Sequence, residues 1–228
     1  MNTAILSLRC AVLACAAFSA QAQGTFKNLN FEQAKIILLG GPYPGSVATT
    51  NALPGWTAYQ GGAQVDSIVY NDLSLGAAWV SIQDTNSPFG GFFGGVIQGT
   101  YTVLLQPEFP GPTNATAAIS QAGQIPATAR SLRFYANGPL SVSFAGQGVP
   151  LFVLGTGTNY TIYGGDVTAF AGLTGDLRFE ANAISPSGWG SSLDNIFFSN
   201  EVVPEPSVVA IAMLGAGILG VLFARRRQ

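Results

Sequence analysis

The chain has 228 residues and 29 glycines, with 9 Lys and Arg against 11 Asp and Glu and a formal net charge of −2. It has no histidine, and its two cysteines, Cys10 and Cys15, lie near the N-terminus, which excludes Ser-His and Cys-His catalysis and the usual zinc and copper sites. The basic residues between positions 23 and 203 are scattered, which argues against a nucleic-acid partner, because phosphate binding needs clustered Lys and Arg.

Residues 1–22 are typical of a secretory signal peptide, which signal peptidase removes. Arg9 precedes a short apolar stretch at residues 10–18, and the small residues Ala20 and Ala22 predict cleavage after Ala22. Two alternatives stay open, a buried N-terminal helix and lipidation at Cys15. A chain cleaved after Ala22 keeps no cysteine, so its domain folds without a disulfide.

Residues 23–201 predict one all-β domain, a jelly roll or another β-sandwich. Short apolar runs alternate with turns rich in Gly, Pro and Asn, and no helical period of useful length occurs. Leu132 and Phe134 alternate with Arg133 and Tyr135, as in a strand with one buried face. The predicted strands cover residues 36–39, 65–70, 77–83, 100–106, 130–136, 140–145, 150–154, 160–163, 176–181 and 193–199. This number of short strands is typical of two packed sheets.

Three short segments of this domain resemble the galactose-binding-like jelly rolls, which include many carbohydrate-binding modules. They are residues 28–32 near the mature start, residues 53–56, and residues 192–198 near the end of the domain. The resemblance implies that the first and last strands lie close together and share a structural calcium ion, with Glu32 and Asp194 at the matching positions. Calcium prefers such oxygen ligands. The alternative is that Glu32 and Asp194 are ordinary cap or turn residues.

Aromatic side chains are the candidate contacts for a sugar ligand. Trp56 and Trp189 are both flanked by small residues, a setting in which an indole ring can stack on a sugar face. Residues 89–95, rich in Gly and Phe, predict a loop that either binds a ligand or folds back on the core. For both tryptophans, the alternative is a place in the core.

A secreted carbohydrate-active hydrolase is the alternative function, because two carboxylates can cleave a glycoside without histidine. The candidate acids are Asp66, Asp72, Asp84, Asp166, Asp176 and Glu180. Several lie in turn sequences, where Asp is favoured for local hydrogen bonds, and no spacing among them indicates an acid–base pair. The sequence therefore predicts a non-catalytic domain with no cofactor beyond the structural calcium ion that the resemblance implies.

The C-terminal residues contain three parts in a fixed order. Pro204, Glu205 and Pro206 come first, an uncharged stretch follows at residues 208–224, and Arg225, Arg226 and Arg227 come last. At about 1.5 Å per residue, the uncharged stretch predicts a transmembrane helix of about 26 Å. The arginines would remain in the cytoplasm and hold this helix in the membrane.

This tail resembles the PEP-CTERM sorting signal of Gram-negative bacteria, whose motif matches Pro204, Glu205 and Pro206. The resemblance implies recognition by an exosortase, removal of the helix and delivery to the cell surface or the extracellular matrix. A permanent membrane anchor is the alternative. The sequence as a whole predicts an exported adhesive, structural or glycan-binding domain associated with exopolysaccharide, as in a biofilm matrix.

Overall fold

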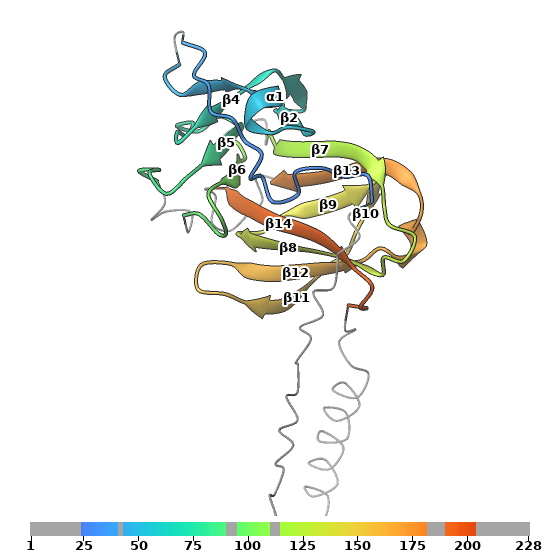
Figure 1. Cartoon of the computed structure of the whole chain (residues 1–228). Coiled ribbons are helices and arrows are strands. Elements are labelled where there is room, and N and C mark those ends of the chain that lie inside the picture. Colours follow the sequence, from blue (N-terminus) through green and yellow to red (C-terminus); the bar gives the residue numbers. More distant parts are fainter. Residues whose placement is uncertain (1–23, 41–42, 90–94, 110–114, 182–189, 204–228) are drawn as a thin grey trace, which may run out of the picture.

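Two β-sheets make up the computed structural model, which describes residues 24–40, 43–89, 95–109, 115–181 and 190–203 (Figure 1). The larger sheet has eight strands in the spatial order β1 (Ser46–Ala48), β4 (Ser67–Tyr70), β5 (Trp79–Gln83), β6 (Thr102–Gln106), β14 (Ser191–Ser199), β8 (Ser131–Asn137), β12 (Thr161–Asp166) and β11 (Leu151–Thr156). The smaller sheet has six, in the order β10 (Gln147–Gly148), β9 (Ser141–Phe144), β13 (Thr174–Ala181), β7 (Ala117–Gln124), β2 (Thr57–Gln60) and β3 (Ala63–Val65). This arrangement confirms the predicted β-sandwich.

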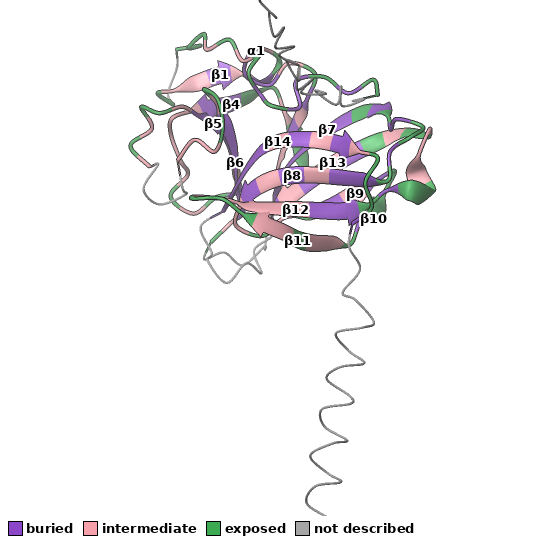
Figure 2. Cartoon of the chain, turned by 60° about the horizontal axis from the view of Figure 1, so that its bottom comes forward, coloured by how far each residue is buried: buried purple, intermediate pink, exposed green. Residues whose placement is uncertain are grey.

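The core lies between the two sheets and follows from the alternation of side chains along the strands. Leu132 and Phe134 of β8 are buried, whereas Arg133 and Tyr135 are partly exposed on the other face. Across the core, Phe179 of β13 meets Phe134 edge to face, with ring centroids 5.2 Å apart. Strand β6 is buried along its whole length (Figure 2), so loops cover the outer face of the larger sheet at this point.

Nine of the ten predicted strands overlap observed ones, and the prediction at residues 36–39 is wrong. The structure has only an isolated bridge between Leu38 and Val47 there, and the apolar side chains of Ile37 and Leu39 are exposed at the edge of the larger sheet. Strands β1, β2, β7 and β10 are missing from the prediction. The longest of them, β7, consists mostly of Ala, Gly, Ser and Gln, which carry little strand propensity. Two short helices, α1 (Thr49–Ala52) and η1 (Thr168–Phe170), complete the fold.

The N-terminal segment packs across the end of the chain. The ring of Phe26 stacks on Phe198 of β14 with centroids 5.4 Å apart, and the Ile196 N–H donates to the Leu29 carbonyl at 2.9 Å. The Gln121 side chain of β7 binds the Lys27 backbone at both its N–H (2.6 Å) and its carbonyl (2.9 Å). The first and last segments of the domain are therefore neighbours, as the resemblance to jelly rolls implies.

Both termini of the full chain lie outside the described residues. These parts include the predicted signal peptide at residues 1–22, the Pro-Glu-Pro motif, the predicted helix at residues 208–224 and the terminal arginines. Within the described ranges, no helix has the length and apolar character needed to cross a membrane. Val203 is only 8% exposed, so the packed domain extends past its predicted boundary at residue 201.

Candidate functional site

Asp194 occupies a bulge in the middle of β14. The register between β14 and β8 shifts between Asp194 and Phe197, and Asn195 within this bulge has a φ of 45°. The bulge turns the Asp194 carboxylate toward the loop that precedes β6, because bulges commonly redirect a side chain. Asp194 Oδ2 accepts hydrogen bonds from the Gln98 N–H at 3.0 Å and the Thr102 hydroxyl at 2.8 Å.

Glu32 approaches the same loop from the N-terminal segment. Asn28 and Phe31 have positive φ values of 51° and 60°, and the Asn28 side chain accepts a hydrogen bond from the Gln33 N–H at 3.0 Å. This turn places Glu32 so that its Oε1 accepts from the backbone N–H groups of Thr100 at 2.8 Å and Tyr101 at 3.1 Å.

The two carboxylates thus hold one segment, residues 97–102, from two sides. We call Glu32, Asp194 and this segment the carboxylate latch. Gly99 is required at its centre, because it has a φ of +65° and because a Cβ there would collide with Glu32 Oε1. The Thr102 hydroxyl also accepts from the Ile97 N–H at 2.9 Å, which closes the segment on itself.

The electrostatics of the carboxylate latch are unusual for a surface loop. Asp194 is only 1% exposed, and this burial raises the pKa of its carboxyl to about 7. Hydrogen bonds from Thr102, Asn195 and Gln98 lower the pKa of Asp194, while the charge of Glu32 raises it. A bound cation would offset both the burial of Asp194 and its repulsion from Glu32.

Carboxylate oxygens such as those of Glu32 and Asp194 are the donors that a hard cation such as calcium prefers. Calcium takes six to eight oxygen ligands, including backbone carbonyls and waters. The described residues contain no cluster of three or more acidic, His or Cys side chains, so Glu32 and Asp194 would be the two acidic ligands and the others would be backbone carbonyls or water. Glu32 Oε1 and Asp194 Oδ2 each accept two hydrogen bonds, so metal bonds would fall to Glu32 Oε2 and to Asp194 Oδ1, which accepts one hydrogen bond, from the Asn195 N–H.

The acids considered for hydrolysis are engaged in local structure. Asp166 accepts from the Thr168 N–H at 2.8 Å at the start of η1, and Glu180 pairs with Arg178 of the same strand at 2.7 Å. Asp72 accepts from the N–H of the next residue at 2.8 Å. Asp66 and Asp176 accept hydrogen bonds through their backbone carbonyls. The side-chain contacts of Asp166, Glu180 and Asp72 are those of cap, ion-pair and turn residues.

Asp84 lies in the most extensive of these local networks, at the end of β5. It accepts hydrogen bonds from the Tyr70 hydroxyl (2.5 Å) and from the Asn71 amide (2.7 Å) and, through both of its oxygens, from Asn86. Burial alone would raise the pKa of Asp84, but these hydrogen bonds hold it below its usual value. The pKa of Tyr70 rises to about 12, because of burial, the hydrogen bond to Asp84 and the charge of Asp84.

The structure corrects one of the two predicted glycan contacts. Trp56 is 4% exposed, its indole N–H donates to the Asn28 carbonyl at 3.1 Å, and its ring packs against Phe31 and Phe179. Trp56 is therefore a core residue, because a ring enclosed in this way has no face left for a sugar. Trp189 lies outside the described residues, and so do residues 90–94 of the predicted aromatic loop.

Three exposed apolar side chains lie on loops next to β5 and β6. Tyr43 is 63% exposed and rests edge to face on Trp79, with ring centroids 6.2 Å apart. Leu75 is fully exposed, but the residues on either side of it are held by hydrogen bonds. The Gln106 side chain donates to the Ser74 carbonyl at 2.6 Å, and the Phe109 N–H donates to the Gly76 carbonyl at 2.8 Å. We call Tyr43, Leu75 and Phe109 the apolar rim.

Sequence patterns identified the two acids of the carboxylate latch but not its other parts. Gly99 and Thr102 carried no signal, because a glycine after a polar run and a threonine at the start of a strand are common. Their roles depend on contacts with residues 68 and 92 positions away along the chain, such as Thr100 with Glu32 and Thr102 with Asp194. The apolar rim was missed for the same reason, since three separate loops form it.

Comparison with known proteins identifies the C-terminal segment. Residues 202–228 match the model of the PEP-CTERM protein-sorting motif. This motif marks an exported surface protein that an exosortase processes. No curated protein matches the chain.

Solved structures resemble the fold at low similarity. An apo cyclase from Fischerella sp. is 13% identical with a TM-score of 0.41, over 77% of this chain and 94% of the cyclase. TmCBM61, solved in complex with beta-1,4-galactotriose, is 14% identical with a TM-score of 0.40, over 78% of this chain and 99% of that one. The enzymatically active domain of bacteriophage CBA120 tailspike protein 4 is 14% identical with a TM-score of 0.40, over 77% of this chain and 21% of that one. At these TM-scores the likeness carries no argument about function.

Proposed function

We propose that this PEP-CTERM chain is a surface or matrix protein of a Gram-negative bacterium, whose β-sandwich is a non-catalytic adhesive unit that binds extracellular polysaccharide. The observation that carries the proposal is the sorting motif at residues 202–228, placed directly after a packed all-β domain. Sorting through the motif would bring the domain to the cell surface, where it is in contact with the polysaccharides that surround the cell. The predicted signal peptide at residues 1–22 and the helix at residues 208–224 belong to the precursor.

The absence of catalysis is part of this proposal, with a two-carboxylate hydrolase as the alternative. Asp194, the described acid with a strongly raised pKa, is 1% exposed, so a polysaccharide has no access to its carboxyl. Glu32 is exposed, but one of its oxygens already accepts two backbone hydrogen bonds. Two carboxylates bound in this way stabilise a loop better than they transfer protons to a substrate.

Structural calcium belongs to the same proposal. Glu32 and Asp194 would hold the ion, which would supply positive charge between two carboxylates and fix residues 97–102. Such an ion has no part in any reaction. Its role is to make the surface loops over the larger sheet rigid enough to present a binding surface.

The apolar rim supplies a place for glycan contact in addition to Trp189. Sugar rings bind proteins by stacking their C–H groups on exposed aromatic faces, and Tyr43 is the most exposed aromatic side chain described. The ring of Trp79 packs edge to face against the ring of Tyr43. A rigid exposed ring loses little conformational entropy on binding, which suits weak and repeated contacts along a polymer.

Binding of the processed protein to exopolysaccharide tests the proposal. We expect protein recovered from the cell surface to be retarded in gels that contain the host's exopolysaccharide, with no release of reducing sugar. Tyr43→Ala should weaken this binding about three- to tenfold, because it removes a stacking ring. Leu173→Ala removes another exposed apolar side chain (53%) from a different loop and should not change the binding. Wild-type protein that shows no retardation in any such gel would leave only a structural role.

A further inference from the structure

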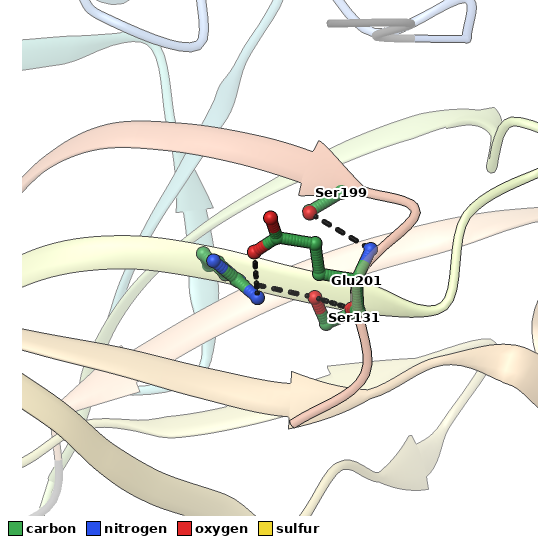
Figure 3. Close-up of polar contacts among 4 residues, drawn as sticks. Ser131, Ser199 and Glu201 are labelled. Atoms are coloured by element: carbon green, nitrogen blue, oxygen red, sulfur yellow. Dashed lines mark hydrogen bonds and ion pairs between the residues drawn. The ribbon is translucent and has the colours of Figure 1, made fainter. Parts of the chain in front are cut away.

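The last described residues turn back over the outer face of the larger sheet. At the end of β14 the Ser199 carbonyl still accepts from the Arg130 N–H at 2.8 Å. The chain then reverses, with the Glu201 N–H bonded to the Ser199 hydroxyl at 3.1 Å. The Ser131 hydroxyl of β8 donates to the Glu201 carbonyl at 2.7 Å, so the turn is fixed to the neighbouring strand (Figure 3).

A side-chain ion pair adds to this attachment. Arg133 of β8 alternates with the buried Leu132 and Phe134, so it lies on the outer face, and its Nη2 is 2.9 Å from Glu201 Oε2. The same guanidinium donates from Nε to the Ser131 hydroxyl at 3.2 Å. The Arg133 side chain is 19% exposed and that of Glu201 is 70% exposed, so the pair is partly screened by water and contributes modestly.

Val203 completes the attachment on the next strand. Gly164 of β12 lies beside Arg133 in the sheet register, and a Cβ at Gly164 would be 3.3 Å from Val203 Cγ2. The missing side chain therefore leaves a space beside Gly164 that the side chains of Leu154 and Val203 both approach, and Val203 is only 8% exposed. We call residues 199–203 together with Ser131, Arg133 and Gly164 the C-terminal clasp.

The C-terminal clasp leaves very little chain between the folded domain and the predicted membrane helix. Residues 204–208 span at most about 18 Å when fully extended, and the Pro-Glu-Pro motif fills the first part of them. An exosortase would have to reach this motif between the domain and the membrane. Release of residues 200–203 from the sheet would add about 14 Å of extended chain.

We propose that the C-terminal clasp must open before the exosortase can cut, and that Arg133 and Glu201 are positioning residues that hold residues 200–203 against the domain until then. This inference rests on the proposed sorting function. It assigns to the domain itself a control over processing: the enzyme acts on a chain whose last four packed residues have come off the sheet. Closed and open forms then differ only in these local contacts, since β14 stays paired on both sides.

A disulfide across the C-terminal clasp tests this order of events. In a disulfide, the Cβ of one cysteine lies about 3 Å from the Sγ of the other, close to the 3.3 Å between a Cβ at Gly164 and Val203 Cγ2. The variant is Gly164→Cys with Val203→Cys, together with Leu154→Ala to remove the Leu154 Cδ1 atom that would lie 2.5 Å from the new Cβ. The chain's own cysteines, Cys10 and Cys15, lie in the predicted signal peptide, so the pair is unambiguous.

Processing is measured by pulse-chase in the native host, with precursor and cut forms separated by mass. Only chains that do not react with maleimide are counted, because these have both cysteines in the disulfide. We expect the cross-linked precursor to be cut at least about tenfold more slowly than the Leu154→Ala, Gly164→Ser, Val203→Ser control. Dithiothreitol should restore the rate of that control. Cutting of the cross-linked chain at the control rate would overturn the inference while leaving the sorting function intact. A wild-type chain that still ends in Gln228 would remove both.

A single substitution gives an independent readout. Glu201→Gln removes the ion pair but keeps the backbone contacts, and it should speed processing about twofold. Glu180→Gln removes the comparable pair with Arg178 from the smaller sheet and should leave the rate unchanged. Equal processing rates for Glu201→Gln and Glu180→Gln would show that the ion pair between Arg133 and Glu201 does not hold the C-terminal clasp closed.

Discussion

Tyr70 and Asp84 join β4 to the end of β5 by a hydrogen bond between a neutral hydroxyl and a carboxylate. The pKa of Tyr70 is raised to about 12 by burial and by Asp84, whereas the pKa of Asp84 is held low. Both shifts favour the same state, a protonated tyrosine beside an ionised acid. The pair therefore stabilises the fold at neutral pH and loses this effect at alkaline pH.

Replacement of Tyr70 by Phe should reveal this dependence. At neutral pH we expect Tyr70→Phe to lower the free energy of unfolding by about 1.5–3 kcal/mol, the usual contribution of a hydrogen bond to a charged group. A raised pKa in the folded state means that stability falls between pH 10 and about 12, where the unfolded state releases its proton and the folded state keeps it. The difference in the free energy of unfolding between wild type and Tyr70→Phe, measured by urea titration, should decrease over that pH range. A difference in the free energy of unfolding that stays constant from pH 9 to 12 would contradict a stabilising hydrogen bond between Tyr70 and Asp84.

Single residues were the hardest feature to predict from sequence. Glu32 and Asp194 were placed at one site because their flanking segments resemble a known pattern, and the structure does bring both to residues 97–102. Trp56 was wrongly predicted to contact sugar, because neighbouring small residues look the same whether they expose a ring or let it enter the core. Only the packing of Phe31 and Phe179 around Trp56 distinguishes the two cases.

The N-terminal segment depends on β7 for its position. A Cβ at Gly123 would lie 2.7 Å from two ring carbons of Phe26, which is 4% exposed and stacks on Phe198. The strand thus uses a glycine to let an aromatic ring pack flat against its backbone. The attachment of the first segment to the sandwich depends on this close approach.

Gly123→Ala should displace that ring. We expect a loss of about 1–3 kcal/mol in the free energy of unfolding, the usual effect of added volume in a packed region. Gly148→Ala in β10 is the matched control, since nothing lies within 4 Å of a Cβ there, and it should stay within about 0.5 kcal/mol of wild type. Urea unfolding followed by tryptophan fluorescence measures both. Equal stabilities of the two variants would show that Phe26 moves aside freely.

Elements with strong alternation were predictable, and elements defined by their neighbours were not. The sequence predicts β8 and β13 because apolar residues occur at every second position in both. β7 lies between β13 and β2 at the centre of the smaller sheet, yet its small residues give no such signal. The apolar run at residues 36–39 gives a strong signal but remains at an edge, because hydrophobicity alone does not decide which segment finds a partner.

The carboxylate latch connects the start, the middle and the end of the domain. Glu32 and Asp194 are far apart in sequence but hold the same loop, so an ion bound there would stabilise the whole sandwich and not one strand. Unfolding of the whole domain therefore reports whether such an ion is bound.

Thermal unfolding of the processed protein should depend on calcium. At a free concentration about a hundredfold above Kd, calcium should add about 2–3 kcal/mol to the free energy of unfolding, and EGTA should remove this gain. Glu32→Gln, which changes an exposed side chain, should abolish the calcium effect while the fold remains intact. Asp176→Asn removes a charge from the smaller sheet, and this variant should still be stabilised by calcium. An identical melting temperature with CaCl2 and with EGTA would reject a calcium site.

Strand β14 carries the chain out of the domain, and it lies between β6 and β8 rather than at an edge. Tension that arrives through the C-terminus therefore pulls along a strand that pairs with β8 as far as Ser199 and with β6 at residues 191–193. Many hydrogen bonds share such a load in shear, whereas an edge strand would unzip one bond at a time. A molecule tethered by this end resists being torn open by flow across the cell.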